Sequence, residues 1–529
     1  MNASPPLGSG GRGLAFFITP LQRNDTMTIL TPDWVRDAVF YQIFPDRFAK
    51  SERVANHLKF EAWGSPPTPF GFKGGNLPGV TDHLDYLQDL GITAIYFNPL
   101  FASAANHRYH TYDYLNVDPL LGGNAALREL LDAAHAHGMR VVLDGVFNHA
   151  SRGFWQFHHT LENGASSPYT DWFHFHPDRL FGARHFGAYP DPAARAELQN
   201  GVGSYEAIGY KAWWDLPALP KFNTDTPAVR EFLWNVGAHW IEFGIDGWRL
   251  DVAQEINDDA FWREFRRRVK TANPEAYIVA EIWEEARRWL QGDQFDAVMN
   301  YLVTKASLGF FIGDRLDDET RAAGGYRNTV RSLSAEQFAD RIDYVLGLYD
   351  SAINDAQLNL LDSHDTPRFL SSAQGDKSAL KLAAMFMFAY PGAPCVYYGD
   401  EIGMPGRHDP DCRRAFPWDE ARWDTDMLAH FKQCIALRKA HPALRRGAYH
   451  RLYARGEVYA FGRQLAGDTV VVALNVSQAA HVVDIPVGAL GLADGPLANA
   501  WGGPSAEVAG GIVRQLSLPP RTGVALSRP

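Results

Sequence analysis

The feature that most constrains the fold is a regular alternation of short apolar runs with longer amphipathic segments. Eight runs are rich in β-branched and aromatic residues and have the length of strands. They are Ala38–Pro45, Ala94–Phe101, Arg140–Phe147, Ile245–Val252, Tyr277–Trp283, Ala297–Val303, Leu358–Asp362 and Pro394–Gly399. Because parallel strands need a helical crossover between them, this alternation predicts a parallel α/β fold. Eight repeats over this length predict a closed (β/α)8, or TIM, barrel.

Helical segments follow the strands, as the barrel requires. Examples are Asn124–His137, Ala228–Phe243, Asp258–Lys270, Ala379–Phe388 and Thr425–Lys439. The first of them is expected to begin with Asn124 as its N-cap and to end at Gly138. An open, doubly wound sheet is the structural alternative, but no G-x-G-x-x-G pattern follows the first strand.

Two departures from the repeat divide the chain into domains. A long insertion, rich in aromatic residues, His, Pro and Gly, separates strands three and four and predicts a subdomain beside the cleft. After Pro442 the pattern changes to short alternating runs such as Val458–Arg463 and Thr469–Asn475, which predict a C-terminal β-sandwich. The predicted domains are a disordered leader (1–32), a barrel in two parts (33–148 and 224–442), the inserted subdomain (149–223) and the sandwich (443–529).

Composition excludes several classes of partner. The net charge is -11, from 61 acidic and 50 basic residues, which disfavours nucleic acid and anionic membranes. No apolar run approaches the ~18 residues of a membrane helix, and the apolar stretch Leu14–Ile18 is too short for a secretory signal. The three cysteines, Cys395, Cys412 and Cys434, have neither disulfide nor metal-ligand spacing. We therefore predict a cytoplasmic protein with free thiols.

Polar side chains end four of the predicted strands abruptly, where barrel enzymes carry their catalytic residues. The segments are Asp144-Gly-Val-Phe-Asn148-His149, Arg249-Leu-Asp251-Val, Ala-Glu281-Ile-Trp283 and Asp362-Ser-His364-Asp365-Thr-Pro-Arg368. A single buried acid is most often part of a structural ion pair. Several acids at one barrel mouth repel each other, so a function must require them.

Glycoside hydrolysis supplies such a function. A retaining enzyme uses two carboxyl groups, one ionised to attack the anomeric carbon and one protonated to assist the leaving group. Arg249 and Asp251 are two positions apart on a strand, so they share a face and the guanidinium can keep Asp251 ionised. Glu281 follows an apolar run, and such surroundings favour the protonated form that the acid needs.

These segments resemble the four characteristic regions of the α-amylase family, glycoside hydrolase family 13. Three further segments, Gly74–Gly79, Asn106–Tyr109 and Pro394–Glu401, extend the resemblance over the barrel. The resemblance implies that Asp251 is the nucleophile, Glu281 the acid/base and Asp365 the carboxylate that stabilises the transition state. It also implies a set of substrate contacts, which we assign to Tyr109, His149, Arg249, Glu255, Trp283, His364 and Arg368.

Within the family, the chain resembles the neopullulanase, cyclomaltodextrinase and maltogenic amylase group. Leu219–Asn223 is similar to the M-P-K-L-N signature of that group, and Val252–Glu255 is similar to its V-A-N-E segment. The group carries an N-terminal domain that mediates dimerisation, whereas about 30 residues precede the first strand here, too few for such a domain. The resemblance therefore predicts a monomer that tolerates long glucans better than its domain-bearing relatives.

The leading functional hypothesis is a hydrolase of α-1,4 bonds, with α-1,6 bonds as an extension, in maltooligosaccharides, cyclodextrins, pullulan or starch. The alternative is a transglycosylase or a sucrose- or maltose-isomerising enzyme that uses the same covalent intermediate. A non-catalytic binding protein is the third hypothesis, but such members lose catalytic carboxylates and all three are present here. We predict no required cofactor or metal, because the loop Ala49–Asn56 lacks the oxygen-ligand spacing of a calcium site. Asn148 leaves a second possible calcium site open.

Overall fold

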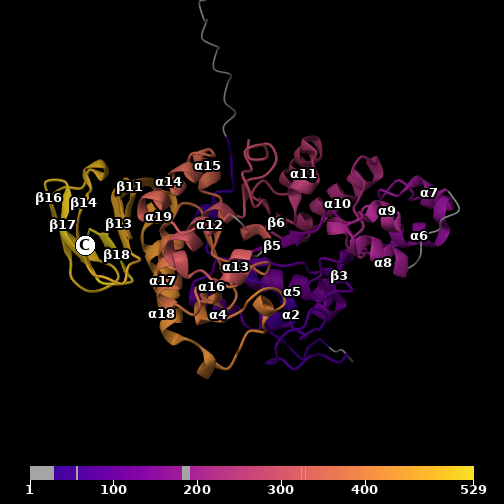
Figure 1. Cartoon of the computed structure of the whole chain (residues 1–529), viewed down its shortest axis with the longest axis horizontal. Coiled ribbons are helices and arrows are strands. Elements are labelled where there is room, and N and C mark those ends of the chain that lie inside the picture. The colour runs from indigo at the N-terminus through magenta and orange to yellow at the C-terminus, as the bar shows by residue number, and fades with distance from the viewer. Residues whose placement is uncertain (1–28, 55–57, 182–190, 323, 328, 529) are drawn as a thin grey trace, which may run out of the picture.

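The computed structural model describes residues 29–54, 58–181, 191–322, 324–327 and 329–528 (Figure 1). The predicted leader, residues 1–32, therefore lies outside the described residues except for its last four positions. Among the described residues, no helix is long and apolar enough to cross a membrane.

The barrel consists of eight parallel strands, all within the predicted runs or one residue outside them. They are β1 (Phe40–Ile43), β2 (Ala94–Phe97), β5 (Arg140–Gly145), β6 (Gly247–Leu250), β7 (Tyr277–Ala280), β8 (Ala297–Val298), β9 (Leu358–Leu360) and β10 (Ala393–Tyr397). Their order is β8-β7-β6-β5-β2-β1-β10-β9. A parallel bridge between Met299 and Leu358 brings β8 to β9, so the sheet closes on itself. The predicted barrel is confirmed.

One predicted strand is wrong in its second half. Ala297–Val303 is extended only as far as Val298, and Tyr301–Ser307 forms helix α12. The apolar run continues into the helix because α12 is buried on almost every side, and a fully buried helix shows no polar face. Apolar content alone cannot separate a buried strand from a buried helix.

Helices follow the barrel strands at the predicted places. The longest are α5 (Gly123–Ala136), α10 (Pro227–Phe243), α11 (Asp259–Ala272), α14 (Ala335–Leu346), α17 (Lys377–Ala389) and α18 (Thr425–Ala440). The short helices are α1 (Trp34–Asp37), α2 (Pro45–Phe48), α3 (Leu77–Thr81), α4 (Leu84–Leu90), α13 (Asp318–Ala322), α15 (Ser351–Asn354), α16 (Phe369–Ser372) and α19 (Pro442–Arg446). The predicted cap of α5 is wrong: Gly122 is the N-cap, and the Asn124 amide instead bonds the backbone of Val117 and Leu115.

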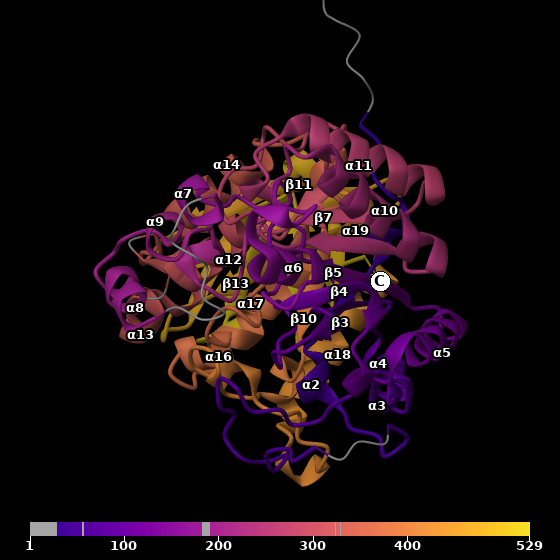
Figure 2. The ribbon, with the colours of Figure 1, turned by 90° about the vertical axis from the view of Figure 1, so that its right-hand side faces the viewer.

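The insertion after β5 folds into a small helical subdomain at one end of the long axis (Figure 1). Its helices are α6 (Trp155–Asn163), α7 (Pro177–Leu180), α8 (Pro192–Gln199) and α9 (Ser204–Ile208), and Figure 2 views the molecule from this side. Phe157 and Phe173 pack with ring centroids 4.9 Å apart in its core. Trp172 and Phe173 are buried in this core, whereas Trp155 and Trp214 are exposed.

The C-terminal strands form an antiparallel domain at the opposite end of the molecule (Figure 1). They are β11 (Ala448–Arg455), β12 (Val458–Leu465), β13 (Asp468–Asn475), β14 (His481–Pro486), β15 (Gly495–Asn499), β16 (Ala506–Ala509), β17 (Ile512–Leu518) and β18 (Thr522–Ser527). Inward-facing residues such as Val471, Ile485 and Val513 form a separate apolar core between the layers. The predicted sandwich is therefore confirmed. All three cysteines are buried and unpaired.

Candidate active site

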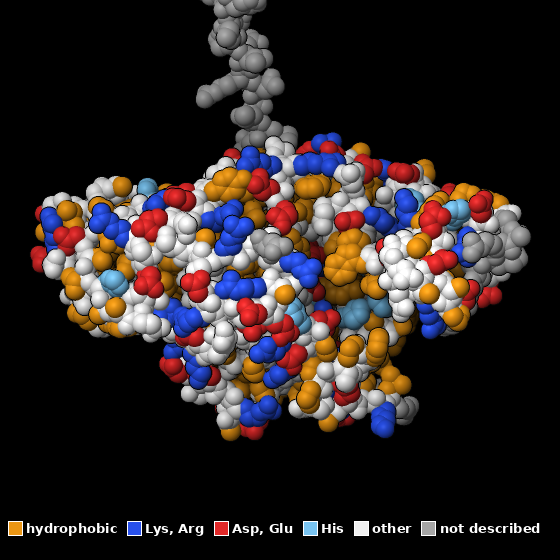
Figure 3. Space-filling view, viewed as in Figure 1, with side chains coloured by type: hydrophobic (Ala, Val, Ile, Leu, Met, Phe, Trp, Pro, Cys, Tyr) orange, Lys and Arg blue, Asp and Glu red, His pale blue; other side chains and the backbone are white. Residues whose placement is uncertain are grey.

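The acidic residues singled out in the sequence lie at the carboxyl ends of barrel strands, three of which are adjacent in the sheet. Asp144 belongs to β5, Asp251 follows β6, Glu281 follows β7, and Asp365 lies in the loop after β9. Because parallel strands end at one rim, these side chains approach each other from different parts of the sequence. Figure 3 shows histidine side chains gathered in a hollow of the molecule beside the inserted subdomain.

Arg249 is the centre of this cluster. Its side chain is fully buried, and its Nη1 lies 2.9 Å from Oδ1 of Asp144 and 3.0 Å from Oδ1 of Asp251. Its Nη2 lies 3.0 Å from Oε2 of Glu281. The predicted pairing of Arg249 with Asp251 is therefore present. One guanidinium thus holds three carboxyl groups in a fixed arrangement, which suits its planar fork of donors.

The backbone after Asp251 turns toward Glu281. Val252 adopts a left-handed conformation, with a φ of 38°, which is unfavourable for a β-branched residue. Such a conformation costs about 1–3 kcal/mol and persists only where the surroundings enforce it. Here it directs the Val252 N–H to Oε2 of Glu281 at 3.0 Å. The strained turn therefore fixes the position of Glu281 relative to Asp251.

A hydrogen-bond chain sets the orientation of His364 and Tyr109. The Gln42 amide donates to Nδ1 of His364 at 2.9 Å, so the proton of this imidazole resides on Nε2. Nε2 then donates to the Tyr109 hydroxyl at 2.6 Å, and that hydroxyl donates to Oδ2 of Asp144 at 2.8 Å. Burial and the nearby Arg249 and Arg413 lower the pKa of His364 well below its ordinary value, so the imidazole is neutral.

His149 lies at the rim between β5 and the subdomain. Burial lowers its pKa to about 3, and its ring is nearly parallel to the Trp213 ring, with centroids 6.3 Å apart. Its buried Nε2 has no hydrogen-bond partner among the described residues. An unpaired buried polar atom is costly, so this nitrogen is suited to a hydroxyl that arrives with a ligand.

Asp365 is the most accessible of the four acids, with 32% of its side chain exposed. Its Oδ2 lies 3.1 Å from Nε2 of His364, and its Oδ1 lies 3.3 Å from Nη2 of Arg413. Sequence reasoning did not single out Arg413 or Gln42. Arg413 lies in the loop after β10, and only the fold shows that this loop returns to Asp365.

Arg368, assigned from the sequence as a substrate contact, is held by protein groups in the structure. It is fully buried, and its Nη1 donates to Oδ1 of Asp400 at 2.7 Å. It also donates to the Cys412 carbonyl at 3.2 Å. The sequence pattern placed Arg368 after the strand end, and in the structure its guanidinium lies against Asp400 and the rings of Tyr397 and Tyr398.

Glu255 lies in the turn after β6 and Trp283 in the loop after β7. The Lys221 ammonium holds Glu255, with Nζ 3.3 Å from Oε2, and connects it to the end of the insertion. The half-buried Trp283 stacks on Tyr301 and donates its indole N–H to Oε1 of Glu281 at 2.8 Å. Trp283 thus contacts the candidate acid directly.

The electrostatics of the cluster favour retention of protons. Burial raises the pKa of Asp144 to about 6, against the opposing effect of Arg249 and of the Tyr109 and Tyr96 hydroxyls. Burial likewise raises the pKa of Asp251 well above its ordinary value, and the neighbouring acids add to this effect while Arg249 opposes it. Since three acids share one guanidinium, the cluster can combine ionised and protonated carboxyl groups near neutral pH.

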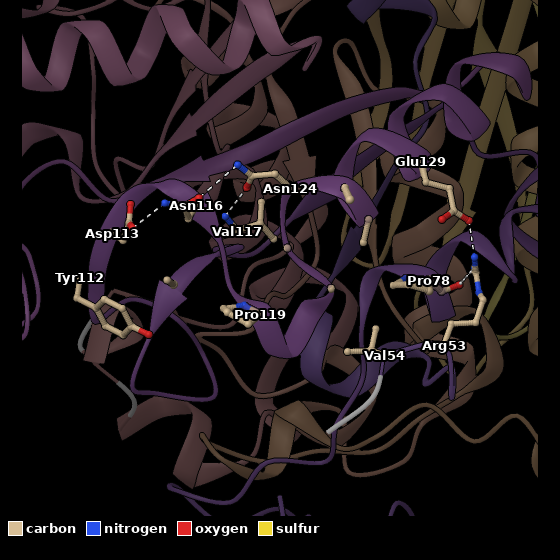
Figure 4. Close-up of a pocket in the computed structure, with 15 residues that line it drawn as sticks. Arg53, Val54, Pro78, Tyr112, Asp113, Asn116, Val117, Pro119, Asn124 and Glu129 are labelled. Carbon is tan, nitrogen blue, oxygen red and sulfur yellow. Dashed lines mark hydrogen bonds and ion pairs between the residues drawn. The ribbon is translucent and has the colours of Figure 1, made fainter. Parts of the chain in front are cut away.

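A separate cavity of about 810 Å³ lies away from these residues, between β4 (Thr111–Val117), the start of α5 and Arg53 (Figure 4). Most of its labelled polar side chains are paired: Arg53 with Glu129, and Asn116 with Asp113. No group of three or more His, Cys, Asp or Glu residues in the described part of the chain is arranged to hold a metal ion.

Comparisons with known proteins agree with this geometry. Residues 42–423 match the alpha amylase catalytic domain family, and residues 449–526 match the neopullulanase-like C-terminal domain family. A cyclomaltodextrinase of a Bacillus species is 44% identical over 85% of this chain and 75% of its own length. A crystallised protein of Thermus thermophilus is 48% identical, with a TM-score of 0.85 over 94% of this chain and 100% of its own. The debranching enzyme of Nostoc punctiforme is 44% identical, with a TM-score of 0.81 over the same shares.

Proposed function

Since the chain belongs to the α-amylase family, we propose that it is an α-glucan hydrolase that retains the anomeric configuration through a covalent intermediate. In this proposal Asp251 is the nucleophile, Glu281 is the acid/base, and Asp365 binds sugar hydroxyls in the transition state. The observation that carries the proposal is the single buried guanidinium of Arg249, which contacts both Asp251 and Glu281 at 3.0 Å. It brings to one point the two carboxyl groups that a retaining glycosidase needs.

In the first step, the Asp251 carboxylate attacks the anomeric carbon while Glu281 gives its proton to the glycosidic oxygen. The bond to the leaving sugar breaks as the glycosyl ester with Asp251 forms. Positive charge develops on the sugar ring, and the negative charges of Asp251 and Asp365 stabilise it. The neutral imidazole of His149, whose Nε2 has no partner among the described residues, is suited to a hydrogen bond with a sugar hydroxyl. His364 is also neutral, so neither imidazole adds a positive charge that competes with the one on the sugar ring.

In the second step, Glu281 accepts a proton from a water molecule, and the resulting hydroxide attacks the anomeric carbon. The ester bond to Asp251 breaks, the carboxylate is restored, and Glu281 regains its proton. Two inversions at the same carbon leave the product in the α configuration. If a sugar hydroxyl replaces the water, the same intermediate gives transglycosylation, so the balance of the two outcomes depends on access to the acceptor side.

We propose α-1,4-linked maltooligosaccharides and cyclodextrins as substrates, with α-1,6 bonds as a second linkage. The likeness to a cyclomaltodextrinase supports the first part, and the likeness to a debranching enzyme supports the second. The aromatic pair Trp213 and Trp214, with centroids 5.3 Å apart beside His149, offers flat faces for glucose rings. Trp214 is 77% exposed and therefore available for such contact.

Proton NMR of the first products from maltoheptaose and γ-cyclodextrin tests the mechanism. We expect the α-anomer to appear first and to mutarotate slowly to the equilibrium mixture. Initial release of the β-anomer would falsify the retaining mechanism. Product analysis on pullulan in the same series distinguishes cleavage of α-1,4 bonds, which releases panose, from cleavage of α-1,6 bonds, which releases maltotriose. Products longer than the substrate indicate transglycosylation.

A further inference from the structure

Trp283 lies two residues after Glu281, and its indole is held by several contacts. Nε1–H donates to Oε1 of Glu281 at 2.8 Å. The ring stacks on Tyr301, with centroids 3.7 Å apart and planes 5° apart. The Lys305 ammonium donates to the Trp283 carbonyl at 3.3 Å and forms an ion pair with Glu284. Together these contacts leave the indole little freedom and keep its N–H directed at the carboxyl group.

A glycine from another loop packs directly against this indole. Gly325 lies in the short turn Gly324–Tyr326, and a Cβ built on it would lie 2.4 Å from Cε3 and Cζ3 of Trp283. Real Cβ atoms essentially never approach another atom so closely. The Gly325 backbone is not in the left-handed region, so space rather than conformation requires the glycine. The next residue, the buried Tyr326, places its ring 5.8 Å from the Trp283 ring.

Both oxygens of Glu281 accept hydrogen bonds in this arrangement. Oε1 accepts from Trp283, and Oε2 accepts from the Val252 N–H and lies 3.0 Å from Nη2 of Arg249. In general, a hydrogen bond donated to a carboxylate favours its ionised form. Among the described residues, the titratable groups that interact with Glu281 are Asp251 and Tyr301, in addition to Arg249. The indole N–H is therefore one of three groups, with the Val252 N–H and Arg249, that fix the position of the Glu281 carboxyl group.

We propose that Trp283 and Gly325 are positioning residues for Glu281. Gly325 provides the space that seats the indole, and the indole N–H fixes Oε1 and sets the alkaline limit of activity. This inference rests on the proposed role of Glu281 as acid/base. It assigns Trp283 a function beyond substrate contact, and it gives the loop after α13 a part in catalysis that the strand-end pattern does not reveal.

Trp283→Phe provides the first test, because it keeps an aromatic ring for the stack on Tyr301 and removes the N–H. A hydrogen bond to a charged group has an effect equivalent to about one pH unit or more. Without this donor the acid keeps its proton up to a higher pH. The alkaline limb of kcat/KM therefore moves about one unit to higher pH. A rise in KM at every pH, with an unmoved alkaline limb, would mean that Trp283 only contacts substrate, and the proposal would be wrong.

Gly325→Ala provides the second test, with Gly488→Ala as its matched control. A Cβ at Gly488 meets no heavy atom within 4 Å, and its backbone is also outside the left-handed region. We expect Gly325→Ala to move the alkaline limb in the same direction as Trp283→Phe, and Gly488→Ala to leave it in place. The Trp283→Phe/Gly325→Ala double variant should show no larger shift than Trp283→Phe alone, because both act on one hydrogen bond. Additive shifts, or a wild-type limb in folded Gly325→Ala, would refute the role of the glycine.

Glu281→Gln separates this inference from the function on which it rests. If that variant keeps the wild-type rate, Glu281 is not the acid/base and the proposed function itself is wrong. If it loses activity by several orders of magnitude while Trp283→Phe keeps the wild-type alkaline limb, only the positioning role is overturned. Far-UV circular dichroism and the Tm of each variant confirm that the compared proteins are folded. Should Gly325→Ala fail to fold, the Trp283→Phe profile decides the proposal.

Discussion

Replacement of Arg249 by lysine tests the charge arrangement on which the proposed mechanism depends. Arg249 contacts Asp144 at 2.9 Å and both Asp251 and Glu281 at 3.0 Å. A lysine keeps the positive charge, but a single ammonium on a shorter, linear chain cannot satisfy three carboxyl groups on different strands. At least one of these three acids therefore loses its charged donor while it remains buried.

The size of the effect follows from the contacts that are lost. A hydrogen bond between charged groups contributes about 1.5–3 kcal/mol, which corresponds to a roughly 10- to 100-fold change in rate. Because Arg249 opposes the rise in the pKa of Asp251, its loss raises that pKa further. The ionised nucleophile then forms only at higher pH, so the acid limb of kcat/KM moves upward by about one unit or more.

The assay is kcat/KM on maltoheptaose between about pH 4 and pH 9 at constant ionic strength. Arg267→Lys is the matched control, since Arg267 is 63% exposed on α11 and pairs with the nearby Glu264. A surface pair of this kind contributes little, and we expect an unchanged profile. If folded Arg249→Lys keeps both the rate and the acid limb of the wild type, the guanidinium does not hold Asp251 ionised and the reasoning fails.

Two further predictions concern stability and metals. Asp251→Asn should abolish activity and yet raise the Tm at neutral pH. The pKa of Asp251 is raised in the folded state, so the wild type loses stability as pH rises through that value. The gain in Tm of the variant should therefore vanish in acid. Calorimetry that finds the same Tm difference between variant and wild type at every pH contradicts this. Prolonged chelation should leave activity unchanged, because the proposed steps use only protein groups; loss of activity that calcium alone restores would reveal a site that we did not identify.

Local sequence patterns were sufficient for the barrel and for most of the cluster. The spacing of apolar runs predicted all eight strands, because burial on both faces requires continuous apolar residues. The separation of Arg249 and Asp251 by two positions predicted their contact, since alternate residues share one face of a strand. The same logic failed at Tyr301, where a buried helix has the composition of a buried strand.

By itself, the sequence determined which acids end the strands, because barrel geometry brings every such position to the same rim. Tertiary structure alone decided the direction of the side chains in the loops beyond that rim. It turned Arg368 to Asp400, brought Gln42 of β1 to His364 after β9, and placed Gly325 against Trp283. These contacts join residues that are far apart in the chain, and no local period encodes them. They exist only after the sheet closes and its loops pack against one another. For this reason the sequence predicts the reacting carboxyl groups but not the residues that position them.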